Sequence, residues 1–125
     1  MPPRLLLLAL VFLFTTLQGA PRPAHGVGED WANEFSLASS HLLELARAAP
    51  QELYSWRPAP GVRSFSEVLM HIAIANFGLL EQAGLEVPNM PPIDSDTEKS
   101  ITGKANVIDF LIESQDAVRA RHHRR

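Results

Sequence analysis

The order of apolar and polar residues predicts three helices, of which the first is residues 29–49. Apolar side chains recur there at alternating steps of four and three, the spacing of one face of an α-helix. Two acidic residues stand at its start, where the helix dipole favours negative charge. Pro50 ends it, because the residue before a proline resists helical backbone angles. The predicted inner stripe is Trp31, Phe35, Ala38, Leu42, Leu45 and Ala49.

The second predicted helix, residues 64–84, is apolar on nearly all sides. Ser64 and Glu67 form an S-x-x-E capping box, in which each side chain accepts a hydrogen bond from the other residue's backbone N–H. Gly84 suits the position just after a helix C-terminus. A helix that is apolar all round is buried on most sides, so this segment suits the centre of a bundle.

The third predicted helix is residues 102–120, with Thr102 as its N-cap. Lys104 and Asp109 are expected to face solvent. Residues 85–101, rich in Pro, Asp and Ser, are long for a connection within a compact bundle, which indicates a functional loop or a crossover. The inner face of this helix is expected to hold Val107, Phe110, Leu111, Ser114 and Val118.

The turn between the first two helices contains Pro58, Pro60 and Gly61, which indicate a rigid loop. Tyr54 and Trp56 precede it, and we expect both to pack across the end of the bundle rather than to lie exposed. No run of alternating apolar residues is long enough to predict a sheet, so the expected fold class is all-α, an up-down helical bundle.

The first 26 residues have the pattern of a signal peptide. Arg4 is followed by the ten-residue apolar run LLLLALVFLF, which is shorter than the roughly 20 residues of a membrane-spanning helix. Ala24 and Gly26 place small residues at −3 and −1 of a cut before Val27. We therefore expect export to a periplasmic or extracellular location, with an uncleaved anchoring helix as the alternative.

Composition and charge narrow the classes of function. The chain has 46% apolar and 20% charged residues, which is typical of a globular protein. Cleavage would remove Arg4 and Arg22, leaving nine Lys and Arg against 14 acids and a net charge of −5. An acidic chain is a poor binder of nucleic acid or anionic membranes. The chain has no cysteine, which excludes disulfides and thiolate metal sites.

His71 is the candidate site residue, and spacing alone leaves two interpretations open. It shares a face with Val68 and Ala75, which favours a core histidine hydrogen-bonded within the protein. The alternative is a metal ligand, but His71 has no second histidine three or four residues away on its helix. His41 lies off the main stripe of its helix, and His122 and His123 lie in a solvated basic tail, residues 122–125.

The segment from Tyr54 to Leu80, YSWRPAPGVRSFSEVLMHIAIANFGLL, resembles the DinB-like superfamily. Its most specific elements are the Trp56-Arg57-Pro58 turn, the helix start at Ser64, and His71 seven residues later. The resemblance extends from about residue 31 to residue 120. It implies a four-helix bundle with a long crossover between the second and third helices, which 85–101 would form.

The same resemblance implies a divalent metal, nickel or zinc, held by three histidines. His71 matches the ligand from the second helix, and the other two would come from an H-x-x-x-H pair on a fourth helix. Family members include metal-dependent thiol transferases and hydrolases. No fourth helix or H-x-x-x-H follows here, so residues 27–121 form an incomplete bundle, as expected of a truncated member. Metal binding by this chain is expected to be weak or absent.

Three functions therefore remain open for the chain. The first is an exported metalloprotein of the transferase or hydrolase type, with His71 as its one ligand. The second is a binding module, in which the groove of the absent helix accepts a partner helix or a second copy as a homodimer. The third is a fragment without function.

Overall fold

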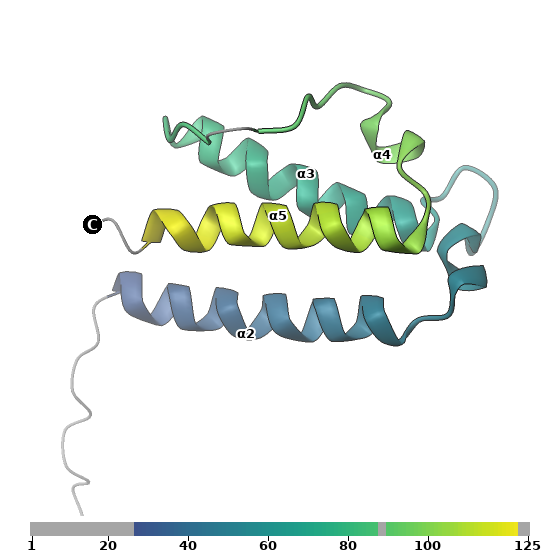
Figure 1. Cartoon of the computed structure of the whole chain (residues 1–125), viewed down its shortest axis with the longest axis horizontal. Helices are drawn as coiled ribbons and strands as arrows, with labels where there is room; N and C mark the ends of the chain where they lie inside the picture. Colours follow the sequence, from purple (N-terminus) through teal and green to yellow (C-terminus); the bar gives the residue numbers. More distant parts are fainter. Residues whose placement is uncertain (1–26, 88–89, 123–125) are drawn as a thin grey trace, which may run out of the picture.

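The computed structural model describes residues 27–87 and 90–122, and within these ranges the regular structure is entirely helical. This confirms the all-α prediction. Figure 1 shows the long helices packed along one another, with a short helical turn in the connection before the last of them. The elements are α2 (Val27–Ala48), the 3₁₀ helix η1 (Gln51–Ser55), α3 (Phe65–Gln82), α4 (Thr97–Ser100) and α5 (Lys104–His122).

Helix α5 packs against both α2 and α3, and it makes its more extensive contact with α3. As Figure 1 shows, α3 and α5 run in the same direction and α2 runs opposite to them. Two neighbouring parallel helices need a connection that returns along their whole length. The segment between α3 and α5 therefore crosses over as predicted, and α4 lies within it, packed against α3.

The core lies where α5 meets the other two long helices. Phe77 of α3 and Phe110 of α5 pack edge to face, with ring centroids 5.7 Å apart. This is a favoured aromatic geometry. The predicted inner face of α5 is confirmed, since all five of its residues are buried. The remaining buried core residues are Ala46, Ala49, Tyr54, Leu69, Met70, Ala73 and Leu80.

Helix α3 begins and ends as its sequence predicts. Glu67 N donates to the Ser64 hydroxyl at 3.3 Å, and Ser64 N donates to the Glu67 carboxylate at 2.7 Å, which completes the capping box. Gly84 follows the helix with a φ of 70°, a left-handed conformation that glycine adopts without steric cost. Both ends of α3 are thus defined by residues close to them in sequence.

The C-terminal end of α2 is capped by residues from elsewhere in the chain. Lys104, which was expected to face solvent, donates through Nζ to the carbonyls of Arg47 and Ala49, each at 2.7 Å. That prediction is wrong because the last carbonyls of a helix lack partners and attract a cationic donor. The first residue of α5 is therefore joined to the last turn of α2.

Three further predictions of side-chain position are wrong. Trp31 and Leu45 of the predicted inner stripe are 53% and 56% exposed, and Ala38 is exposed as well, because α2 turns a neighbouring face, with Ser39 and Ala46, toward the core. Trp56 is 57% exposed, whereas Tyr54 is buried and packs edge to face on Phe65. Thr102 is not the N-cap of α5, because the helix begins at Lys104.

Some predictions fall on residues that lie outside the described ranges. They are the signal peptide of residues 1–26 and the part of the basic tail from 123 to 125. Across residues 27–87 and 90–122, none of the helices has the length and apolar character needed to span a bilayer.

Candidate functional site

His71 lies on α3 with 54% of its side chain exposed, so the interpretation of a core histidine is wrong. The face of α3 that packs inward carries Leu69, Met70 and Ala73. His71 points away from that face, as do the exposed Val68 and the exposed Ala75. Because α3 is apolar nearly all round, its sequence could not indicate which face the rest of the bundle covers.

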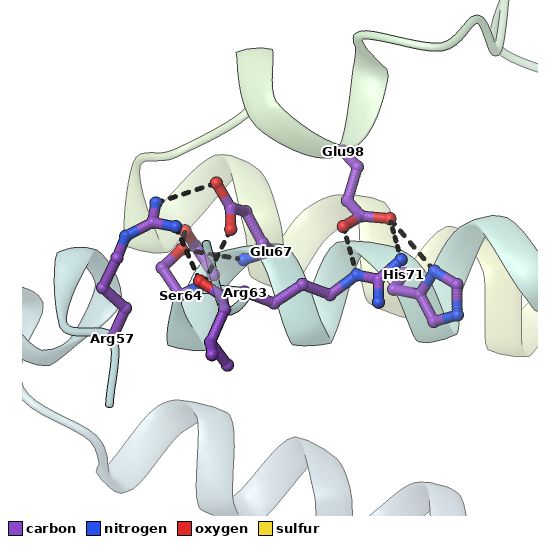
Figure 2. A network of polar contacts seen from close by, with 8 residues as sticks. Arg57, Arg63, Ser64, Glu67, His71 and Glu98 are labelled. Atoms are coloured by element: carbon purple, nitrogen blue, oxygen red, sulfur yellow. Dashed lines mark hydrogen bonds and ion pairs between the residues drawn. The ribbon is translucent and has the colours of Figure 1, made fainter. Parts of the chain in front are cut away.

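The ring of His71 is held by an acidic residue from the crossover. His71 Nδ1 lies 3.0 Å from Glu98 Oε2, and Glu98 belongs to α4, 27 positions later in the chain. The Glu98 carboxylate also accepts hydrogen bonds from Arg63, with Nε bound to Oε1 and Nη2 bound to Oε2. Figure 2 shows this carboxylate reaching from α4 toward the guanidinium of Arg63 and the imidazole of His71, with dashed lines to both.

The charges in this group are balanced. The Arg63 hydrogen bond is the main cause that lowers the pKa of Glu98, and the hydrogen bond from His71 lowers it further. Glu98 in turn raises the pKa of the Arg63 guanidinium. Glu98 is therefore an anion that binds two donors at once, and only 19% of its side chain is exposed.

A second ion pair lies one turn toward the N-terminus of α3. Arg57 Nη2 contacts Glu67 Oε1 at 3.0 Å, and Arg57 Nη1 donates to the carbonyl of Val62 at 2.7 Å. The arginine of the Trp-Arg-Pro turn thus holds the capping carboxylate and the loop in front of α3, as Figure 2 shows. These contacts of Arg57 fix the start of α3. They thereby also fix the position of His71, which lies one turn after Glu67.

The fit of a divalent metal to these residues is limited. In the described part of the chain, no three His, Cys, Asp or Glu side chains come together as a metal-binding group. His71 can offer its free Nε2, while the carboxylate nearest to it is bound by Arg63. Zinc and nickel sites need several converging ligands. His41, the other histidine whose side chain the structure describes, is exposed on α2.

Glu98 is the residue of this group that sequence reasoning missed. Asp94 and Thr97 form a local turn just before α4, whose N-cap is Asp96. Asp94 Oδ1 accepts from the Thr97 hydroxyl at 2.8 Å, and Asp94 N donates to that hydroxyl at 2.9 Å. No sequence signal connects Glu98 with His71, because their contact depends on how the crossover folds back over α3.

A family model of the DinB superfamily matches residues 34–124, which include all of α3, α4 and α5. The chain belongs to the DinB superfamily. The match agrees with the all-helical bundle that the structure shows. No curated protein and no solved structure gives a significant match to the chain.

Proposed function

We propose that this DinB-superfamily protein is a divalent-metal-binding protein of the transferase or hydrolase type, to which His71 contributes one ligand atom, Nε2. The observation that carries this proposal is the contact of His71 Nδ1 with the Glu98 carboxylate on an exposed part of α3. A histidine that ligates a metal through one nitrogen usually donates its other N–H to a carboxylate or carbonyl. Nickel and zinc are the metals that membership of the superfamily favours.

The site formed by the described residues is incomplete, because no third His, Cys, Asp or Glu side chain joins His71 and Glu98. The isolated chain is therefore expected to bind metal weakly. Isothermal titration of the purified full chain with Ni²⁺ or Zn²⁺ tests this, with His71→Ala compared to the matched variant His41→Ala. Weak binding that is lost only in His71→Ala supports the proposal. Tight stoichiometric binding that survives His71→Ala contradicts it.

A second function, as an interaction module, is favoured by large apolar side chains exposed on two helices. Trp31 and Leu45 of α2 and Val68 and Leu79 of α3 are between 43% and 63% exposed. Exposed apolar surface of this kind favours association with a partner helix or a second copy. Size-exclusion chromatography with light scattering tests self-association. A concentration-dependent dimer that Leu79→Lys dissociates supports this function, and a monomer at all concentrations contradicts the homodimer.

Export is part of the proposed function. The positive Arg4, the ten-residue apolar run and the small residues at 24 and 26 support cleavage before Val27. Helix α2 begins at Val27, so this cut would leave the described helix intact. Mass spectrometry of the protein from the periplasmic and culture fractions of an expressing bacterium tests it. A mature N-terminus at Val27 is the expected result, and a full-length chain retained in the cytoplasm contradicts export.

A further inference from the structure

We propose that Glu98 is a positioning residue, which holds the neutral His71 ring in the tautomer with the proton on Nδ1 and the lone pair on Nε2. The importance of this for metal binding rests on the proposed function. The tautomer itself is independent of the proposed function, because it follows from contacts within the chain. The crossover between α3 and α5 would then determine the chemical state of the exposed histidine.

The chemistry of the contact determines the tautomer. An ionised carboxylate only accepts hydrogen bonds, so the ring nitrogen that faces Glu98 at 3.0 Å has to be the donor. A neutral imidazole carries one proton, and the other nitrogen then has a free lone pair. With Nδ1 as the donor, that lone pair is on Nε2. The His71 side chain is more than half exposed, so a ligand from outside can approach it.

Glu98 can perform this role because its carboxylate is itself fixed. Arg63 binds both of its oxygens, which prevents the carboxylate from turning away from the imidazole. The helical turn that carries Glu98 is anchored by the buried Thr97, whose hydroxyl bonds to Asp94. The position of Glu98 is thus determined from α4 and from the loop before α3, and His71 is the partner that it orients.

The tautomer can be read directly by NMR. The full chain is labelled with ¹⁵N on histidine, treated with a chelator and measured at about pH 8, above the ordinary titration range of an imidazole. Long-range ¹H–¹⁵N spectra distinguish a protonated from an unprotonated ring nitrogen. His71→Ala assigns the signals. We expect an unprotonated Nε2 in the wild type and a shift toward protonated Nε2 in Glu98→Ala.

Two variants serve as controls. Glu98→Gln keeps an amide oxygen that can accept from Nδ1, so it is expected to retain part of the wild-type signature. Glu113→Ala removes an exposed glutamate from α5 and is expected to change nothing at His71. Circular dichroism shows whether each variant remains folded. A wild-type ring with its proton on Nε2, or a folded Glu98→Ala variant with an unchanged tautomer, overturns the proposal.

Titration with Ni²⁺ alone separates this inference from the proposed function. If His71 binds nickel, Glu98→Ala is expected to weaken that binding by about 10- to 100-fold, the usual effect of removing the partner of a ligating histidine. If the wild type shows no binding that depends on His71, the proposed function fails while the tautomer result still supports positioning by Glu98. Equal nickel affinity of wild type and Glu98→Ala at His71 overturns the positioning role.

Discussion

The Tyr54 hydroxyl donates a 2.7 Å hydrogen bond to the carbonyl of Ala46, and both residues are buried. In a continuous helix, the carbonyl of Ala46 would accept from the backbone N–H of residue 50. Residue 50 is a proline and has no such N–H. The residue that ends α2 therefore leaves a buried carbonyl unpaired, and a tyrosine from the next turn supplies the missing donor.

Tyr54→Phe is expected to destabilise the protein by about 1–2 kcal/mol, because the buried Ala46 carbonyl then has no partner while the ring is kept. For a domain of this size, such a loss lowers Tm by roughly 5–10 °C. Thermal and urea unfolding followed by circular dichroism measure the change. Trp56→Phe, which alters an exposed aromatic residue in the same segment, is the matched control and should change the stability little. An equal effect of the two variants would contradict this role of Tyr54.

The interface between α2 and α5 contains a polar side chain with only part of its hydrogen-bonding capacity used. Gln115 is 1% exposed, and its Nε2 donates to the carbonyl of Ser39 at 3.3 Å. Its Oε1 is the only buried side-chain N or O atom without a partner among the described residues. Gln115→Leu removes both polar atoms with little change in volume and is expected to raise the free energy of unfolding by about 1 kcal/mol.

Ser114, the residue before Gln115, is a buried polar side chain whose hydrogen-bonding atoms do have partners. Its hydroxyl accepts from Asn76 Nδ2 at 3.1 Å and donates to the carbonyl of Leu111 at 2.8 Å, so its hydrogen bonds are complete. Ser114→Ala leaves the buried Asn76 amide without that acceptor and is expected to cost about 1–2 kcal/mol. Urea unfolding of both variants tests the pair. A loss of stability in Gln115→Leu as large as that in Ser114→Ala would show that the unpaired oxygen has a partner in solution.

The sequence predicted the features that depend on neighbours in the chain. The capping box of Ser64 and Glu67 and the glycine after α3 are local, and the structure confirms them. The face of α2 could not be predicted in the same way. Its apolar stripe at Trp31 and Leu45 is regular, yet the small residues Ser39 and Ala46 are the ones that α5 covers. Periodicity shows that a helix has an apolar side, but the neighbouring helix determines which residues are buried.

The candidate site was predictable only in part for the same reason. His71 is identifiable from its position seven residues after the helix start, but spacing alone favours a buried ring, and the ring is exposed. Its partner Glu98 lies in a segment that the sequence describes only as a long connection. Contacts between a helix and a distant crossover depend on the folded chain, and a single sequence without a local motif does not show them.

The contacts of Glu98 with Arg63 and His71 are expected to help hold α4 against α3. Arg63→Ala removes two of the hydrogen bonds to its carboxylate, while the side chain of Arg63 itself is half exposed. We expect faster amide hydrogen exchange in α4, with little change in α5 and in global stability, because exposed ion pairs contribute little to unfolding. Arg119→Ala breaks an ion pair within α5 and is the matched control. Unchanged exchange in α4 would show that other contacts hold the crossover.

The capping box predicts how stability depends on pH. The backbone hydrogen bond from Ser64 is the largest cause that lowers the pKa of Glu67, followed by the hydrogen bond from Arg57. A carboxyl whose pKa is lower in the folded state stabilises the protein above its ordinary pKa, and this contribution is lost as the pH falls through the lowered value. The ionised carboxylate of Glu67 therefore stabilises the folded protein at neutral pH, and this contribution to the free energy of unfolding is lost in acid.

Glu67→Gln is expected to be less stable than the wild type near pH 7, and the difference should shrink as the pH falls below about 4.5. At low pH the wild-type side chain is protonated and resembles the amide, so the two proteins then lose the same interactions with Ser64 and Arg57. Urea unfolding at a series of pH values from about 3 to 7 measures the difference, with Glu113→Gln as the control for an exposed glutamate. A difference that stays constant over the whole range would show that Glu67 stabilises α3 by its shape rather than by its charge.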